Sequence, residues 1–309
     1  MRSFQLLLPN GGAVTGIHSI PPRSASIQHH PLIVGLHGGT YDCHYFDANG
    51  EHTASKLSTA LGVPFVSIDR PCYGGTSSFL PIPKDSDYAN ETGTWLHLYI
   101  LPALWAKFGA PNNCNCIVLL SHSLGAIGAT IVGAKHAQEQ TPAYPLGGII
   151  ISGLGGQLIP SMIESPIAEP NAPPDHVVFP VQMKDALMFR PGTVHPDILA
   201  RTEKLNAPCP FVELDALRSI WVPRWKSEWA AHIVAPVKFA LVEQDCFWEG
   251  TEEHVRDCVK AFRKSIRVDG SLIRGAPHCL ELSFWSQGWY GSCFGFAVEC
   301  AASFAVQAV

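Results

Sequence analysis

A short serine-containing motif offers the clearest chemistry in the sequence. Ser121-His122-Ser123-Leu124-Gly125 stands between an apolar run, 117–120, and a stretch of small residues, 126–129. This order predicts a strand, a sharp turn and a helix. A turn of this kind strains the backbone of its central residue and lifts the side chain clear of the sheet, so Ser123 is expected to be an exposed nucleophile. The N-terminus of the following helix would favour negative charge beside it.

One position departs from the usual pattern of such turns. The pattern has Gly two residues before the nucleophile, where strand and helix nearly touch, and this chain has Ser121. Serine is small enough to fit there. The motif therefore needs support from the rest of the chain, because a string of this kind also occurs by chance.

A serine nucleophile needs a base for its proton and an acid that orients the base. In open sheets of parallel strands, such groups gather at the carboxyl ends of the strands. His278 is our candidate base, because it follows an apolar strand in the Gly/Pro-containing loop 275–278. Asp245 is our candidate acid and Glu243 the alternative, since both follow the strand that ends near Val242. Asp245 is preferred because it lies further into the loop, where its side chain can turn across the sheet edge.

The developing oxyanion needs hydrogen-bond donors close to the nucleophile. The loop His37-Gly38-Gly39-Thr40 carries few side-chain atoms, so a backbone N–H in it can approach a substrate carbonyl. We expect Gly39 to be one donor, with Thr40 as the alternative. The second expected donor is the N–H of Leu124, directly after the nucleophile.

Apolar runs alternate with helical patterns over most of the chain. A hairpin is predicted at the start, with strands at 4–8 and 13–19 around the turn Pro9-Asn10-Gly11-Gly12. Further strands are expected at 32–36, 63–68, 117–120, 148–152, 237–242 and 266–273, and helices at 51–61, 94–108, 252–264 and the C-terminus. Strands that are nearly uniformly apolar indicate a mostly parallel sheet covered on both faces. The fold class is therefore α/β, with a doubly wound sheet.

The alternation stops in the segment 157–235, which is rich in proline and aromatic residues. Three tryptophans in it, Trp221, Trp225 and Trp229, fall four residues apart, on one face of a helix. With Phe211, Phe189 and Met188 they could line an apolar pocket or form the packing core of the segment. His195 and His232, in the same segment, are expected to be structural.

Composition excludes several classes of protein. The chain has 309 residues, a formal charge of −5 and no basic stripe, so a nucleic-acid partner is not expected. Ten cysteines without a C-x-x-C pair favour free, buried thiols over a metal site, and we expect no metal and no cofactor. The apolar stretch 291–309 is interrupted by Glu299 and Gln307, which favours a terminal helix packed on the sheet over a membrane span. We expect a cytoplasmic protein and leave its oligomeric state open, with a homodimer as one option.

Taken together, these motifs resemble those of the α/β-hydrolase family, in particular its cap-bearing esterases, lipases and C–C hydrolases. Ser-His-Ser-Leu-Gly resembles the Gly-His-Ser-Leu-Gly elbow of the family. Leu-His-Gly-Gly at 36–39 resembles its oxyanion loop, and the stretch 69–77 resembles its Asp-Arg-Pro-Gly-Tyr-Gly-x-Ser turn. The departures are Ser121, Cys72 where Gly is usual, and Ala126 where a second Gly often follows.

The resemblance implies a division of the chain. Residues 1–156 and 236–309 would form the α/β-hydrolase core, and 157–235 would be a mainly helical cap inserted after the sixth strand. The order Ser123, Asp245, His278 is the one that the family requires.

The expected function is that of a serine-dependent hydrolase acting on an ester, lactone or thioester of a medium-sized apolar compound through an acyl-enzyme. An alternative is a cyclase, acyltransferase or C–C hydrolase of natural-product metabolism that uses the same three residues. A second alternative is a ligand receptor that keeps the hydrolase fold.

Overall fold

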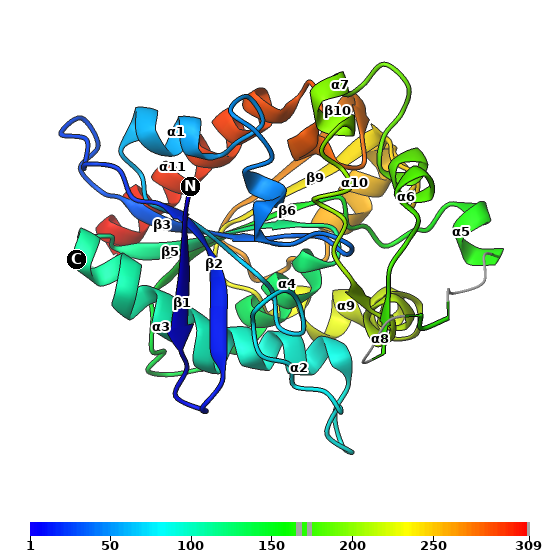
Figure 1. Cartoon of the computed structure of the whole chain (residues 1–309). Helices are drawn as coiled ribbons and strands as arrows, with labels where there is room; N and C mark the ends of the chain where they lie inside the picture. Colours follow the sequence, from blue (N-terminus) through cyan, green and yellow to red (C-terminus); the bar gives the residue numbers. More distant parts are fainter. Residues whose placement is uncertain (165–168, 172–174, 308–309) are drawn as a thin grey trace.

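An eight-stranded sheet organises the part of the chain that the structure describes (Figure 1). The structure is a computed structural model, and it describes residues 1–164, 169–171 and 175–307. The strand order is β1-β2-β4-β3-β5-β6-β9-β10. The strands are β1 (Arg2–Leu7), β2 (Ala13–Ser19), β3 (Pro31–Leu36), β4 (Phe65–Ile68), β5 (Cys116–His122), β6 (Leu146–Ser152), β9 (Val237–Gln244) and β10 (Val268–Pro277).

The sheet is parallel except at one edge. β1 and β2 form the predicted hairpin, and β2 pairs antiparallel with β4. From β4 to β10 all neighbours run parallel. Every residue of β3, β5 and β6 is buried, as expected for strands that are covered on both faces. The predicted fold class, an α/β protein with a mostly parallel sheet, is confirmed.

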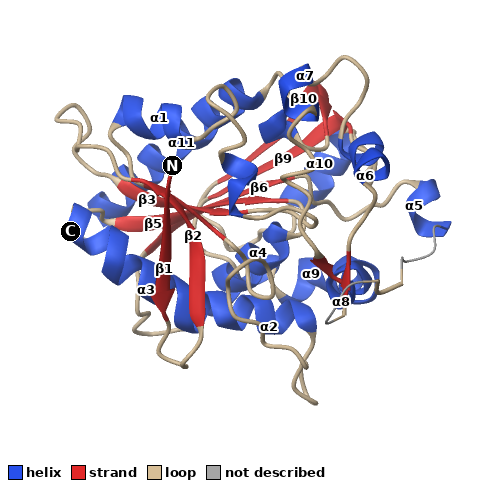
Figure 2. Cartoon of the chain, viewed as in Figure 1, coloured by secondary structure: helices blue, strands red, loops and turns tan. Residues whose placement is uncertain are grey.

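Helices cover both faces of the sheet, as Figure 2 shows in blue against red strands. One face packs against α1 (Ser55–Leu61) and α11 (Ser286–Gln307). The other face packs against α4 (Gly125–His136) and α10 (Glu252–Val259), and α4 in turn packs against α2 (Tyr88–Trp95). α3 (Leu101–Leu104) continues α2 along the chain. Because the helices cover the two faces, the edge of the sheet at the carboxyl ends of the parallel strands is lined by loops.

The described part of the segment 157–235 contains short helices and a pair of two-residue strands. Its elements are α5 (Pro160–Glu164), β7 (His176–Val177), α6 (Val181–Met188), α7 (Pro196–Leu199), β8 (Cys209–Pro210), α8 (Phe211–Ala216) and α9 (Val222–Glu228). β7 and β8 pair antiparallel, apart from the main sheet. Figure 1 shows these helices on one side of the molecule, beyond the ends of β6 and β9.

The tryptophans of this segment serve packing. Trp221 and Trp225 are stacked with ring centroids 5.1 Å apart, and Trp221 and Trp229 with centroids 6.1 Å apart. All three belong to the same apolar cluster as Ile117 and Leu119 of β5 and the apolar residues of α4. Phe189 and Met188 pack into the cluster on the other face of the sheet.

Several element ends differ from those predicted. The helix expected at 94–108 begins at Tyr88, where the Asp87 side chain accepts a hydrogen bond from the Asn90 N–H and caps it. α10 ends at Val259, earlier than predicted, and β9 and β10 run further, to Gln244 and Pro277. All ten cysteines are free and buried, as expected. No helix in the described ranges is both long and apolar enough to cross a membrane.

Candidate active site

Ser123 occupies the sharp turn between β5 and α4. Its φ of 49° lies in the left-handed region, which costs a non-glycine residue about 1–3 kcal/mol. The start of α4 lies so close to the end of β3 that a Cβ on Gly125 would lie 2.4 Å from the Leu36 carbonyl oxygen. The Ser123 N–H donates to the Ser152 carbonyl over 2.8 Å. The sequence therefore builds the strained turn that its motif predicts.

Ser121 fits its position by making a hydrogen bond of its own. The side chain is fully buried, and Oγ donates to the Ile150 carbonyl of the neighbouring strand β6 over 2.6 Å. The hydroxyl that replaces the usual glycine is therefore satisfied.

Three of the predicted side chains lie in a hydrogen-bonded row. Ser123 Oγ is 3.1 Å from His278 Nε2, and His278 Nδ1 is 2.9 Å from Asp245 Oδ2 and 3.1 Å from Asp245 Oδ1. Asp245 Oδ1 also accepts the N–H groups of Phe247 and Trp248 at 2.8 and 3.3 Å, which fixes the carboxylate. These residues come from the ends of β5, β9 and β10.

Glu243 lies apart from this row. It is still within β9, and its carboxylate accepts hydrogen bonds from Arg274 at 2.7 Å and from the Gly275 N–H at 2.8 Å. These two donors hold the pKa of Glu243 below its ordinary value. The structure thus places Asp245, and not Glu243, beside His278.

The loop after β3 runs directly against the serine. A Cβ added to Gly38 would lie 3.0 Å from Ser123 Cβ, and one added to Gly39 would lie 2.7 Å from Leu124 Cδ1. Only glycines allow this approach. No acceptor among the described residues takes a hydrogen bond from the N–H of Gly39 or of Leu124. No side chain in the described part of the chain caps α4, so the positive end of its dipole also faces this point.

Thr40, the alternative donor, is engaged elsewhere. Its carbonyl accepts the Ala207 N–H over 2.9 Å, and its backbone is near enough to the Cys209 thiol to help lower the pKa of that group, against the larger effect of burial. Its φ is 64°, an uncommon value for a β-branched residue. The geometry therefore favours Gly39 over Thr40 as the amide available to a substrate.

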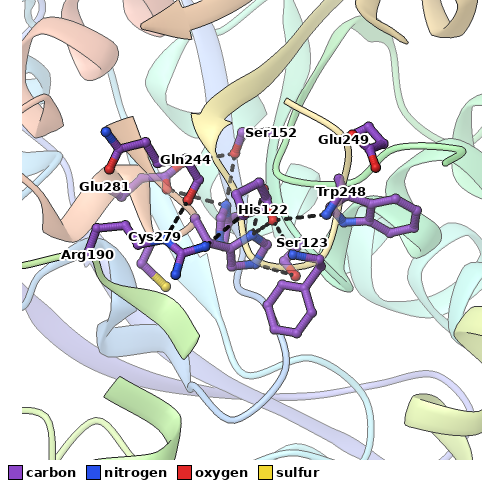
Figure 3. Close-up of polar contacts among 12 residues, drawn as sticks. His122, Ser123, Ser152, Arg190, Gln244, Trp248, Glu249, Cys279 and Glu281 are labelled. Atoms are coloured by element: carbon purple, nitrogen blue, oxygen red, sulfur yellow. Dashed lines mark hydrogen bonds and ion pairs between the residues drawn. The ribbon is translucent and has the colours of Figure 1, made fainter. Parts of the chain in front are cut away.

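A buried polar group behind His278 was not predicted from the sequence. Glu281 is completely buried and accepts hydrogen bonds from Tyr45 Oη at 2.8 Å, Trp289 Nε1 at 2.8 Å and Ser152 Oγ at 3.1 Å. His122 Nδ1 lies 3.4 Å from the same carboxyl group (Figure 3). The His122 ring packs between Tyr45 and His278, with both centroid distances at 4.9 Å.

Burial shifts the pKa of both Glu281 and His122. It raises the pKa of Glu281, against the effect of its hydrogen-bond donors, and it lowers the pKa of His122 well below the ordinary value. His122 is therefore neutral at physiological pH. A lone glutamate within the apolar stretch 279–282, directly after His278, was the available signal in the sequence.

The segment 157–235 contacts the loops of the site. The Arg190 guanidinium lies 3.4 Å from the Gln244 carbonyl oxygen (Figure 3). The Met188 carbonyl accepts the Cys279 N–H over 3.2 Å. Arg70, in the loop after β4, forms a buried, two-pronged ion pair with Glu213 of α8. The loops after β4, β9 and β10 are therefore all held by this segment.

Only one group of side chains in the described ranges has the spacing of metal ligands. It consists of the consecutive residues Asp42, Cys43 and His44. Asp42 Oδ1 already accepts the His44 N–H over 2.8 Å, and burial raises the pKa of Cys43, which disfavours the thiolate that a metal needs. This group gives no support for a metal site.

Comparison with known proteins extends over most of the chain. A family model described as the alpha/beta hydrolase family matches residues 33–285. Similar solved structures include an esterase from Thermogutta terrifontis, with 13% identity, a TM-score of 0.59 and coverage of 97% of this chain and 100% of that one. An enol-lactonase from Burkholderia xenovorans shares 12% identity at a TM-score of 0.60 (95% and 99% covered). A monoacylglycerol lipase from Paleococcus ferrophilus shares 15% at 0.54 (97% and 100% covered). Among curated proteins, the sequence finds no significant match.

Proposed function

The chain belongs to the alpha/beta hydrolase family, and from that premise we propose that it cleaves an ester, lactone or thioester of a medium-sized apolar compound through an acyl-enzyme. Membership confirms the resemblance predicted from the sequence and the general class, a hydrolase. The observation that carries the proposal is the hydrogen-bonded row of Ser123, His278 and Asp245.

In the first half of the proposed reaction, His278 acts as the base. Its Nε2 takes the proton of Ser123 Oγ as that oxygen attacks the substrate carbonyl carbon. Asp245 accepts the Nδ1–H of the ring and stabilises the imidazolium that forms. The backbone N–H groups of Phe247 and Trp248 hold the Asp245 carboxylate in place beside the ring.

The negative charge that develops on the substrate oxygen is bound by the N–H groups of Leu124 and Gly39. Both amides lie beside Ser123 and have no acceptor among the described residues, so they are free for this oxygen. One such donor contributes roughly 10²–10³-fold to kcat in serine hydrolases.

The second half releases the acid. The imidazolium of His278 gives its proton to the leaving alcohol or thiol, and the carbon–oxygen or carbon–sulfur bond breaks. His278 then takes a proton from water, whose oxygen attacks the acyl-enzyme. Ser123 departs with that proton, and the free acid leaves.

The segment 157–235 is our proposed cap over this site, since its contacts reach the loops after three of the strands. Its tryptophans are used in packing, so the apolar surface for a substrate comes from side chains closer to Ser123. Leu124 lies against Gly39, and the Phe247 ring stands edge-on to His278 at 4.7 Å. Similar folds in an esterase, an enol-lactonase and a lipase support an ester-type substrate.

The first test combines a covalent probe with a series of substrates. We expect a fluorophosphonate to label Ser123, and p-nitrophenyl esters of increasing acyl length to be hydrolysed. Ser123→Ala should abolish labelling and lower kcat by roughly 10⁴-fold or more. Absence of labelling together with unchanged turnover in Ser123→Ala would rule out covalent catalysis.

Once a natural substrate is found, product analysis distinguishes hydrolysis from the other reactions of this fold. Hydrolysis places oxygen-18 from solvent water in the acid product. A product of the same mass as the substrate would instead indicate cyclisation, and tight binding without turnover would indicate a receptor.

A further inference from the structure

The two ring nitrogens of His37 make different hydrogen bonds. His37 follows β3, and its side chain is completely buried. Nδ1 lies 2.7 Å from the carbonyl oxygen of Gly38, and Nε2 lies 3.2 Å from the backbone nitrogen of Arg70. Neither bond is used in the reaction described above, although Gly38 lies so near Ser123 that an added Cβ would be 3.0 Å from the Ser123 Cβ.

These partners determine where the proton of the ring sits. The backbone N–H of Arg70 can only donate, so Nε2 must carry its lone pair. The Gly38 carbonyl can only accept, so the proton is on Nδ1. Burial, aided by the Arg70 charge, lowers the pKa of His37 to about 3, and the ring therefore stays neutral in this tautomer over the working pH range.

The Gly38 carbonyl and the Gly39 N–H belong to the same peptide group. This group is planar and trans, so the N–H points opposite to the C=O. Fixing the carbonyl oxygen therefore fixes the direction of the N–H. The peptide joins two glycines, whose backbone torsions are the least restricted of all residues, so it would otherwise rotate freely.

Side chains cannot supply the missing rigidity. A Cβ on Gly38 or on Gly39 would press on Ser123 or Leu124, so the close approach requires both glycines. We propose that His37 is a positioning residue, whose Nδ1–H holds the Gly38 carbonyl so that the Gly39 N–H is directed at the substrate oxyanion. This inference rests on the proposed acyl-enzyme function and names a residue that this function requires.

Two substitutions of His37 distinguish the hydrogen bond to Gly38 from the hydrogen bond to Arg70. In His37→Asn, the side-chain amide NH₂ lies near the position of Nδ1 and can still donate to Gly38. In His37→Gln, the side-chain carbonyl reaches toward the Arg70 N–H, but no donor remains for Gly38. Both variants remove the imidazole, so a loss caused by general loosening of the loop affects both.

We expect His37→Gln to lower kcat for p-nitrophenyl butyrate by roughly 10- to 100-fold, approaching the loss of an oxyanion donor, with KM within about twofold. His37→Asn should recover kcat to within about threefold of the wild-type value, because it keeps the donor. Thermal midpoints measured alongside confirm that both variants are folded. Equal losses in the two variants, or a change confined to KM, would overturn the inference.

A measurement on the wild-type protein does not depend on how the variants fold. Nitrogen-15 spectra of labelled histidine should show His37 with a proton on Nδ1 and none on Nε2 between pH 5 and 8. A proton on Nε2 would overturn the inference. Failure of the proposed function looks different, because Ser123 would then not react with a fluorophosphonate, whatever the tautomer of His37.

Discussion

Asp245 and Glu243 stand two positions apart and have different partners. Asp245 lies beyond the end of β9, and its carboxylate reaches His278 and two backbone N–H groups. Glu243 is the penultimate residue of the strand and points to Arg274. Strand geometry explains the difference, because only the residue that has left the strand can turn its side chain along the sheet edge.

This pair allows a matched test of the acid. Asp245→Asn should lower kcat by roughly 10⁴-fold, because the amide favours the wrong tautomer of His278. Glu243→Gln should change kcat by less than about twofold, since it weakens an exposed ion pair and keeps an oxygen that can accept the Gly275 N–H. The measurement is steady-state hydrolysis of a p-nitrophenyl ester. A larger loss of kcat in Glu243→Gln than in Asp245→Asn would show that Glu243 is the acid that orients His278.

The start of α4 packs closely against the end of β3, and this contact depends on the missing side chain of Gly125. Gly125 must lack a Cβ, because that atom would lie 2.4 and 2.5 Å from the carbonyl oxygens of Leu36 and His37. Both are backbone atoms of a central strand and its loop, so they cannot move aside cheaply. Gly295 in α11 is also helical, but it is exposed and has open space around its Cα.

The two glycines should therefore respond in opposite directions to the same change. Gly125→Ala is expected to lower the free energy of unfolding by about 3 kcal/mol through overpacking. Gly295→Ala is expected to raise it by about 0.5–1 kcal/mol, through helix propensity alone. Urea denaturation followed by circular dichroism measures both. Similar effects of the two substitutions would contradict the close strand–helix contact.

Local patterns predicted the elements that carry the site. The uniformly apolar runs gave the parallel strands, and the strand–turn–helix order around Ser123 placed the serine at its turn. Asp245 and His278 could be named because each directly follows a strand of this kind. The start of α2 was missed because its capping residue, Asp87, lies eight residues before Trp95, the first of the Leu and Trp positions that show helical spacing.

Contacts between distant parts of the chain could not be predicted from the sequence. Glu281 is satisfied by Tyr45, Ser152 and Trp289, which come from three separate elements. The buried pair of Arg70 and Glu213 joins residues 143 positions apart. No periodicity in the sequence relates such residues, so only the assembled fold shows which polar groups meet.

Buried neutral histidines give the whole molecule a characteristic response to acid. His37 and His122 are completely buried, and burial lowers the pKa of both below the ordinary value of 6.5. Above pH 6.5 neither state of the protein holds these protons. Below it, the unfolded chain binds protons that the folded protein cannot, so stability falls as the pH falls. The raised pKa of Glu281 has the opposite effect, because the folded protein then binds one proton more readily than the unfolded chain, which stabilises it as the pH falls.

The two histidines outweigh the single carboxyl group, so the net effect is still a loss of stability as the pH falls. We expect the free energy of unfolding to decrease by about 1.4 kcal/mol or more per pH unit between pH 6 and 5. Urea titrations at pH 7.5, 6.0, 5.5 and 5.0 measure this slope. His122→Phe removes one of the two histidines and should make this slope smaller by up to about 1.4 kcal/mol per pH unit, the effect of one proton. A stability that stays constant or increases toward pH 5 would contradict the burial of neutral imidazoles.

The tryptophan stack has a consequence for exchanging parts between related enzymes. By chain order the helical stretch 217–228 belongs to the segment 157–235, but its Trp221 and Trp225 pack in the same apolar core as residues of the sheet. Grafting a complete foreign segment would remove these rings from the interior and leave a void beneath the strands. A chimaera that keeps the native chain from Leu217 onward retains Trp221 and Trp225 in the core. The junction with a foreign segment should therefore lie before Leu217, within the segment 157–235, and not at its end.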